Sequence, residues 1–329
     1  MLGRRVFIAG SLIVLAGPLV VMAPVVAQPP RVYQLGVVIQ GGPAYDLAVD
    51  GLRDGLRELG LEDGKQLILH VRDVKGDLRA VEAAARGLES QHVDLIYAWS
   101  TSVSLAVVRG TKKVPVIFYA GTDPVAVGLV GNFRKPGGRV TGMHGWTTDL
   151  TAKRLAILQE MVPRLRRVVT FYNPENPAAQ QAVKLARETA RQLKIELVEH
   201  RVSSIEDLRA GLQALRPGED EAYFHVSDSM MTSQLPLIIE ATTSKRLPTM
   251  FQDRLSVVQG GLASYGVDYY AVGRLAAKQV QRVLLGANPG DLPIEQIDRI
   301  PFVVNMKTAK ALGLAIPPAV MGRADEVIR

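Results

Sequence analysis

The chain has 329 residues, a net charge of +7, 47% hydrophobic residues and no cysteine. This length predicts two domains of ordinary size, and the composition supports a buried core rather than a disordered chain. The lack of cysteine excludes disulfide bridges, cysteine-ligated metal sites, a cysteine nucleophile and a lipidated N-terminal cysteine. The charge is spread along the sequence and gives no indication of nucleic-acid binding.

Residues 1–27 have the pattern of a secretory signal peptide. Arg4 and Arg5 precede an uncharged run, residues 6–26, which contains two prolines and ends in small residues. A basic start, an apolar centre and a small-residue exit are typical of a leader that signal peptidase removes. We therefore expect cleavage near Ala27 and a protein that works in the periplasm.

Two alternatives remain for this leader. The uncharged run is long enough to span a bilayer, so a retained membrane helix is possible. The segment Arg4-Arg5-Val6-Phe7-Ile8 resembles a twin-arginine core, although an ordinary Sec leader fits equally well. Cleavage removes two arginines and no acidic residue, which lowers the net charge to +5. It also leaves no stable membrane anchor.

Strands and helices alternate along the rest of the chain. Short apolar runs predict strands, and apolar residues at helical spacing predict helices between them. In the first half we expect strands at 33–39, 66–71, 93–98, 114–119 and 140–143, with helices at 44–59, 77–88 and 101–109. The pattern then restarts, with strands at 167–172, 195–199, 222–226, 248–251, 261–265 and 301–304. Its helices are expected at 150–161, 178–193, 205–214, 235–243, 268–285 and 307–312.

Two successive arrays of this kind predict an α/β fold with two doubly wound parallel-sheet lobes. The connection near residues 143–149 contains no Ser/Gly-rich linker, which favours lobes hinged closely around a ligand cleft. Ligands of open parallel sheets bind at the carboxyl ends of strands, where helix N-termini point. The candidate ligand-binding residues are therefore those at the strand ends: Gln40, Trp99, Ser100, Thr101, Ala120, Thr122, Tyr172, Asn173, Asp228 and Phe251.

These side chains suggest an amphipathic ligand with both charges. Hydroxyl and backbone N–H groups at 100–101 and Thr122 suit a carboxylate, and Asp228 suits an ammonium group. Structural roles are the alternative for each, because Ser100, Thr101 and Asp228 are also ordinary helix caps and Trp99 is also an ordinary core residue.

Signatures of catalysis and of metal or cofactor binding are missing from the sequence. It contains no G-x-S-x-G, H-E-x-x-H, Walker A or G-x-G-x-x-G motif in the required context. The five histidines stand far apart, and each is expected to be a surface or packing residue. We therefore expect no catalytic residue, no metal site and no cofactor.

Several short motifs together resemble one family. They are Val114-Pro115-Val116-Ile117-Phe118, Thr122-Asp123-Pro124-Val125, Pro136-Gly137-Gly138-Arg139-Val140-Thr141-Gly142, Asn173-Pro174-Glu175-Asn176-Pro177 and Lys307-Thr308-Ala309-Lys310-Ala311-Leu312-Gly313-Leu314. With the tail Arg323-Ala324-Asp325-Glu326-Val327-Ile328 they resemble the ABC-transporter substrate-binding proteins of the tryptophan/tyrosine-binding-like family, which have a type I periplasmic binding protein fold. Arg139 departs from the family, which usually has asparagine there.

The resemblance implies a small-molecule ligand trapped between two lobes and delivered to an ABC permease in the inner membrane. It also implies three crossings between the lobes. One lobe then comprises 28–144 and about 266–300, and the other 145–265 and about 301–329. The ligand itself does not carry over, because the pocket varies within the family. An amino acid or a related small carboxylate is expected from the candidate residues.

Two other functions share this sequence pattern. A periplasmic sensing module that presents its ligand to a receptor or kinase would use the same pocket, and neighbouring genes would discriminate the two. A secreted enzyme on the same fold is the third possibility. The sequence argues against it, because it shows no nucleophilic side chain paired with a general base.

Overall fold

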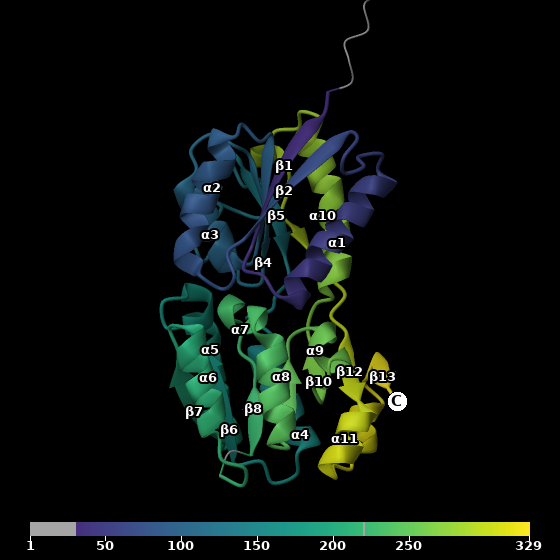
Figure 1. Ribbon diagram of the computed structural model, residues 1–329. Helices are drawn as coiled ribbons and strands as arrows, with labels where there is room; N and C mark the ends of the chain where they lie inside the picture. The colour runs from purple at the N-terminus through teal and green to yellow at the C-terminus, as the bar shows by residue number, and fades with distance from the viewer. Residues whose placement is uncertain (1–30, 220) are drawn as a thin grey trace, which may run out of the picture. The chain divides into compact units, whose positions relative to one another are not determined.

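The strands form two separate sheets, which the computed structural model places end to end (Figure 1). The structure describes residues 31–219 and 221–329, so the predicted leader lies outside the described residues. The first sheet has the order β11-β5-β4-β3-β1-β2. Its strands are β1 (Tyr33–Ile39), β2 (Leu67–Asp73), β3 (Leu95–Trp99), β4 (Val116–Ala120), β5 (Val140–His144) and β11 (Glu295–Gln296).

The second sheet has the order β13-β12-β10-β9-β8-β6-β7. Its strands are β6 (Arg167–Tyr172), β7 (Glu196–Arg201), β8 (Ala222–Phe224), β9 (Thr249–Phe251), β10 (Ala263–Tyr265), β12 (Phe302–Asn305) and β13 (Glu326–Ile328). Neighbouring strands run parallel in both sheets, except that β10 and β12 are antiparallel. The expected α/β architecture of two parallel-sheet lobes is confirmed, with this one reversal.

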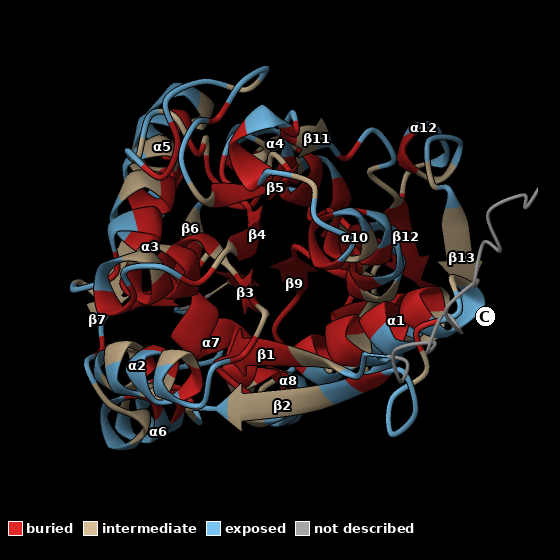
Figure 2. Ribbon diagram, turned by 90° about the horizontal axis from the view of Figure 1, so that it is seen from above, coloured by how far each residue is buried: buried red, intermediate tan, exposed pale blue. Residues whose placement is uncertain are grey.

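Helices cover both faces of each sheet. They are α1 (Pro43–Glu58), α2 (Val81–Ser90), α3 (Thr101–Gly110), α4 (Thr151–Met161), α5 (Pro177–Leu193), α6 (Ile205–Ala214), α7 (Ser229–Ser233), α8 (Leu235–Ser244), α9 (Arg254–Val258), α10 (Tyr269–Leu284), α11 (Met306–Leu312) and α12 (Pro318–Met321), with 3-10 turns η1 (Leu78–Ala80) and η2 (Pro289–Asp291). Figure 2 shows that the sheets are largely buried, whereas the outer faces of α2 and α6 are exposed. Within the described residues, no helix combines the length and apolar character that a membrane crossing requires.

The chain passes between the sheets three times. It leaves the first sheet after β5, returns from β10 through α10 to β11, and crosses again to β12. A helix that connects two strands of one sheet makes those strands parallel. Between β10 and β12 the chain passes through the first sheet instead, so β12 is free to run antiparallel to β10. Periodicity alone cannot reveal this reversal.

The return helix α10 packs tightly along α1. A Cβ atom on Gly273 of α10 would lie 2.0 Å from the backbone oxygen of Ala48, and one on Gly51 of α1 would lie 2.0 Å from the backbone oxygen of Tyr270. Glycine at both positions therefore lets the two backbones touch. This contact places the N-termini of α1 and α10, with Tyr45 and Tyr269, beside each other.

The short elements α7, α9, β11 and β13 are absent from the sequence-based prediction. Each has two to five residues, as in α7 (Ser229–Ser233) and β11 (Glu295–Gln296), and such lengths show no periodicity. Longer elements agree with the prediction to within a few residues; for example, the helix expected at 268–285 spans Tyr269–Leu284.

Candidate functional site

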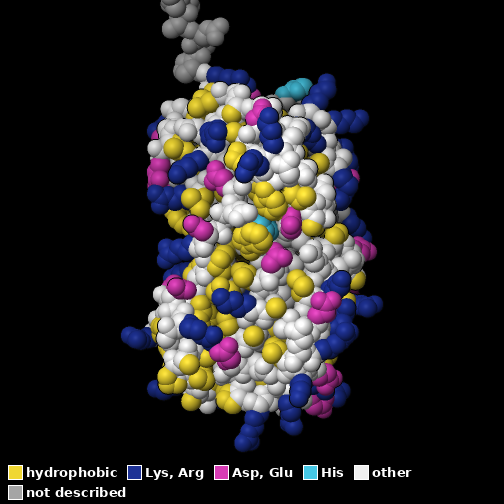
Figure 3. Space-filling model, turned by 180° about the vertical axis from the view of Figure 1, so that it is seen from behind, with side chains coloured by type: hydrophobic (Ala, Val, Ile, Leu, Met, Phe, Trp, Pro, Cys, Tyr) yellow, Lys and Arg dark blue, Asp and Glu magenta, His cyan; other side chains and the backbone are white. Residues whose placement is uncertain are grey.

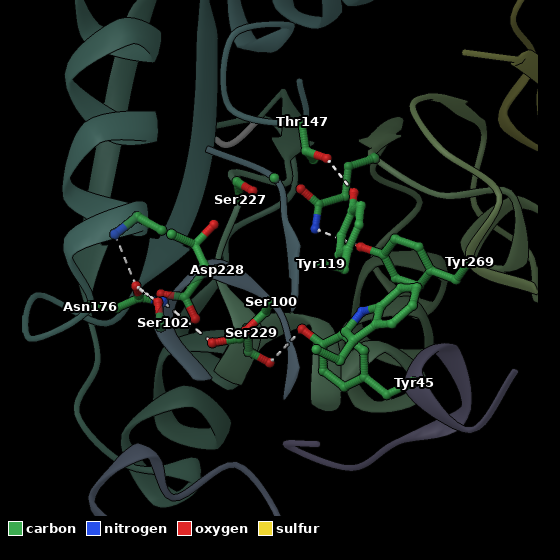
Figure 4. Close-up of a pocket in the computed structure, with 15 residues that line it drawn as sticks. Tyr45, Ser100, Ser102, Tyr119, Thr147, Asn176, Ser227, Asp228, Ser229 and Tyr269 are labelled. Atoms are coloured by element: carbon green, nitrogen blue, oxygen red, sulfur yellow. Dashed lines mark hydrogen bonds between the residues drawn. The ribbon is translucent and has the colours of Figure 1, made fainter. Parts of the chain in front are cut away.

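A cavity lies where the carboxyl ends of β3 and β4 face those of β8 and β9 (Figure 4). It contains about 360 Å³ of empty space, part of it open to solvent. Fifteen residues line it: Tyr45, Trp99, Ser100, Thr101, Ser102, Tyr119, Gly121, Thr147, Asn176, Ala178, Ser227, Asp228, Ser229, Gln252 and Tyr269. The site therefore lies at the strand ends of both sheets, as expected for this class of fold.

Four of the residues proposed from the sequence line this cavity: Trp99, Ser100, Thr101 and Asp228. Six others do not: Gln40, Ala120, Thr122, Tyr172, Asn173 and Phe251. Side chains alternate across a strand, so the last residue of a strand and the residue after it point in different directions. At β9, for example, Phe251 is buried against Tyr223 in the core, and the following Gln252 lines the cavity.

The six residues outside the cavity have structural partners. Gln40 donates from Nε2 to the backbone oxygen of Gly76 at 3.2 Å. The hydroxyls of Thr122 and Thr148 are 2.8 Å apart. Tyr172 lines a separate groove with Arg187, and its hydroxyl accepts a hydrogen bond from Arg201 Nε at 3.1 Å. Asn173 donates its backbone N–H to Asp228, Ala120 is fully buried, and Phe251 has no exposed surface.

Strand-end reasoning missed the residues contributed by helix starts. Tyr45 and Tyr269 belong to the first turns of α1 and α10, and Asn176 is the N-cap of α5. Tyr269 reaches the first sheet only because α10 returns to it. A signal for Gln252 was present, because it directly follows a predicted strand.

Four aromatic rings form one wall of the cavity. Trp99 stacks on Tyr119, with ring centroids 4.6 Å apart, and meets Tyr269 edge-on at 5.3 Å. Tyr45 stacks on Tyr269 at 6.0 Å. Burial raises the pKa of all three tyrosines well above the usual value, so their hydroxyls stay neutral at any physiological pH.

The opposite wall is polar. Figure 4 shows Ser102, Asn176, Ser229 and Asp228 across the cavity from the three tyrosines. Ser102 of α3 donates its hydroxyl hydrogen to Asn176 Oδ1, and Asn176 Nδ2 lies 3.5 Å from Ser229 Oγ. These bonds join the start of α3 in one lobe to the starts of α5 and α7 in the other.

Ser100 combines a cap with a strained backbone. Its hydroxyl accepts a hydrogen bond from Val103 N at 3.4 Å, and its φ angle is 88°. A non-glycine residue at such an angle costs of order 1–3 kcal/mol, and such strain is concentrated at functional sites. The residue therefore serves as the helix cap considered from the sequence and also lines the cavity.

Asp228 is likewise both a cap and a cavity residue. Its Oδ1 accepts from the N–H groups of Met230 at 2.8 Å and Met231 at 3.1 Å, and its Oδ2 accepts from Asn173 N at 2.8 Å. Burial raises the pKa of this carboxyl to about 6, against the lowering effect of these hydrogen bonds. Backbone N–H groups therefore occupy much of the hydrogen-bond accepting capacity of the Asp228 carboxylate.

Charge around the cavity is sparse. Among the residues that the structure describes, Asp228 is the only carboxylic acid in the lining, and no Lys, Arg or His side chain lines it. One cation lies just behind the lining: Arg154 Nη2 donates to the backbone oxygen of Thr147 at 2.8 Å. Burial lowers the pKa of Arg154 to about 10, which leaves it charged at neutral pH. On the face shown in Figure 3, Lys and Arg are interspersed with Asp and Glu.

One of the histidines, His225, is a buried core residue. His225 is fully buried between the Tyr223 hydroxyl and Thr232, and burial lowers its pKa to about 3. It is therefore neutral. In the part of the chain that the structure describes, no group of three or more His, Cys, Asp or Glu side chains is placed to hold a metal ion.

Comparisons with known proteins agree with this architecture. The family model described as "ABC transporter substrate binding protein" matches residues 35–328. A tyrosine-binding protein of Clostridioides difficile strain R20291 is 28% identical over 274 residues, covering 83% of this chain and 78% of that protein. The members of this family are ligand-binding proteins, not enzymes.

Solved structures give the same result. An ABC domain from Streptococcus pneumonia in complex with L-Trp has a TM-score of 0.80 and 25% identity, covering 90% of this chain and all of that one. A conserved domain protein from Vibrio cholerae has a TM-score of 0.81 and 28% identity over the same shares. Type I periplasmic binding proteins share the fold. The chain belongs to the ABC transporter substrate binding protein family.

Proposed function

We propose that this protein binds an α-amino acid with an aromatic side chain between its two lobes and delivers it to an ABC permease in the inner membrane. The observation that carries the proposal is the composition of the cavity: four aromatic rings face a polar wall that has one acid and no base. This lining suits a ligand that is flat and apolar at one end and zwitterionic at the other.

The aromatic wall argues for a planar side chain. Trp99, Tyr119, Tyr45 and Tyr269 offer ring faces and edges, and aromatic pairs add about 0.5–1.5 kcal/mol beyond the area they bury. The relatives support this choice, since one is named for tyrosine and another holds L-Trp.

The charge balance argues against other ligand classes. A phosphate or a dicarboxylate would bring two negative charges into a cavity lined by no cation and by Asp228. Desolvating those charges without a partner is costly. A zwitterion brings no net charge, and the start of α3 at Ser100 offers free N–H groups to its carboxylate.

Contacts between the lobes suggest how the ligand is trapped. Tyr45 of α1 donates to the backbone oxygen of Ser229 at 3.3 Å, and Gln252 donates to the hydroxyl of Tyr269 at 3.2 Å. Ligand bound to one lobe would be enclosed when the other makes these contacts, and it shifts the equilibrium by binding the closed form more tightly.

The remaining parts of the proposal concern domains and location. The first lobe comprises residues 28–144 with about 266–300, and the second comprises 145–265 with about 301–329. Residues 1–27 direct the chain to the periplasm and are removed there. Transport is preferred to sensing because the family match is to transporter components.

A thermal-shift screen tests the ligand class directly. The protein without its leader is melted with each of the twenty amino acids, with polyols and with dicarboxylates. L-Tyrosine, L-tryptophan or both are expected to raise the melting temperature, because a ligand of the folded state stabilises it by mass action. Calorimetry is then expected to give micromolar affinity, about −8 kcal/mol. A shift with polyols or dicarboxylates and none with aromatic amino acids would contradict the proposal.

A further inference from the structure

Two buried polar atoms of the cavity lining have no hydrogen-bond partner among the described residues. They are Oε1 of Gln252, an acceptor, and Nε1 of Trp99, a donor. Gln252 is 3% exposed and Trp99 is 1% exposed, so water does not freely replace the missing partners. Leaving such atoms unsatisfied is costly, and native proteins rarely do so without a reason.

The orientation of the Gln252 amide follows from its neighbours. Thr232 donates its hydroxyl hydrogen to the backbone oxygen of Asp228 at 2.8 Å. The Gln252 atom that lies 3.1 Å from the same hydroxyl must therefore be a donor, Nε2, which also lies 3.2 Å from the hydroxyl of Tyr269. Oε1 is consequently the atom left without a partner.

Asp228 is poorly suited to be the main acceptor for a ligand ammonium group. Three backbone N–H groups, those of Asn173, Met230 and Met231, already donate to its two oxygens. It fixes the start of α7 and the loop after β6. Among the fully buried side-chain acceptors that the structure describes in the lining, the neutral oxygen of Gln252 is the one without a partner.

The cavity that Trp99 lines also contains a helix start that suits an anion. Trp99 directly precedes Ser100, the N-cap of α3, a helix of ten residues. The first-turn N–H groups of Thr101 and Ser102 have no acceptor within the helix, and the helix dipole adds a partial positive charge. Trp99, whose indole N–H has no partner, lines the same cavity as this helix start.

We propose that Gln252 Oε1 accepts a hydrogen bond from the ammonium group of the bound amino acid, and that Trp99 Nε1 donates to its carboxylate beside the start of α3. This assignment rests on the proposed function and adds the residues that recognise each end of the zwitterion. In it, Asp228 shapes the site and supplies background charge, and Gln252 discriminates amino acids from their deaminated analogues.

Calorimetry with three probes tests the assignment: L-tryptophan, indole-3-propionate, which lacks the ammonium group, and tryptamine, which lacks the carboxylate. Gln252→Met is expected to weaken L-tryptophan about tenfold or more and indole-3-propionate less than twofold. Trp99→Phe is expected to weaken L-tryptophan and indole-3-propionate by a similar factor, and tryptamine much less.

Matched variants control for packing. Gln279 is also a buried glutamine with an unpartnered Oε1, but it lies in α10 away from the cavity and donates to the backbone oxygen of Pro293. Gln279→Met is expected to leave all three affinities unchanged. Gln252→Glu retains the acceptor and adds a negative charge, so it is expected to increase the preference for L-tryptophan over indole-3-propionate even if Gln252→Met folds poorly.

The outcomes separate the two proposals. Two results would overturn the assignment and leave the proposed function intact. In the first, Gln252→Met weakens the binding of L-tryptophan and of indole-3-propionate equally. In the second, the preference for L-tryptophan over indole-3-propionate is lost in Asp228→Asn but not in Gln252→Met. Failure of the unaltered protein to bind any aromatic amino acid would overturn the proposed function, and the assignment with it.

Discussion

The ring of Tyr45 stacks on that of Tyr269, with their centroids 6.0 Å apart and their planes 14° apart. The two residues are far apart in sequence and meet because α1 and α10 touch through glycine. The aromatic wall of the cavity therefore depends on the distance between α1 and α10, which carry two of its four rings.

The first prediction concerns this helix contact. Gly273→Ala puts a methyl group 2.0 Å from the backbone oxygen of Ala48, which forces α10 away from α1. We expect the free energy of unfolding to fall by about 3 kcal/mol, at the upper end for overpacked sites, and the affinity for aromatic ligands to fall as Tyr269 moves. Urea unfolding and calorimetry measure the two effects.

A second helix glycine provides the control for Gly273→Ala. A Cβ on Gly87 of α2 meets nothing within 4 Å. Gly87→Ala is expected to stabilise the protein by about 0.5–1 kcal/mol, because alanine restricts the unfolded chain and favours helix. Equal stability of the two variants would show that the close packing of α1 on α10 is not needed.

The second prediction concerns the strained cap Ser100. Alanine there loses the cap and keeps a φ of 88°, whereas glycine adopts that angle without strain. We expect Ser100→Ala to lower the free energy of unfolding by about 1–2 kcal/mol and Ser100→Gly to change it by a few tenths. Denaturant titration of both variants measures the difference, and an alanine variant as stable as the glycine variant would show that the backbone here is unstrained.

The third prediction concerns the approach of the two lobes. A Cβ on Gly42, the N-cap of α1, would lie 2.4 Å from the backbone oxygen of Ser233 in α7. Gly42→Ala is expected to weaken ligand binding at least tenfold, because the closed form can no longer form without a clash. Calorimetry and small-angle scattering with ligand measure the effect.

Gly60 is the matched control for Gly42→Ala. Its φ of 81° is close to the 92° of Gly42, but nothing lies within 4 Å of a Cβ there. Gly60→Ala therefore also places alanine at a positive φ, but without the clash. We expect it to lower stability and leave ligand affinity unchanged; a similar loss of affinity in both variants would assign the effect to strain.

The fourth prediction concerns the pH dependence of stability. Burial raises the pKa of Asp228 from 3.8 to about 6. The folded state therefore holds this proton more tightly than the unfolded chain, and the stability that it contributes is present below about pH 4 and is lost as the pH rises through 6. The shift corresponds to about 3 kcal/mol.

Comparison with Asp228→Asn isolates this group. Asparagine does not titrate, so the difference in free energy of unfolding between the two proteins is expected to change in favour of the variant from pH 4 to pH 7. Urea unfolding at several pH values measures it. A constant difference over this range would show that Asp228 ionises in the fold as it does in an unfolded chain.

Local patterns predicted the fold well, and they predicted part of the lining of the candidate cavity. The apolar run at 33–39 and the helical spacing at 268–285 correspond to a strand and a helix in the structure. Trp99 and Asp228, chosen for their place at strand ends, line the cavity. Tyr45 and Tyr269 were not found, because only the return of α10 to the first sheet brings them together. Phe251 was chosen in place of Gln252 because the direction of a side chain at a strand end depends on register.

The three passages between the sheets have a consequence for truncated chains. Residues beyond about 265 supply α10 and β11 to one sheet and β12 and β13 to the other. Loss of this C-terminal segment therefore removes an edge strand from both halves at once and exposes the face of α1 that α10 covers. A premature stop near Tyr265 would not leave one intact half beside a damaged one, because each half is completed only by the last fifth of the chain.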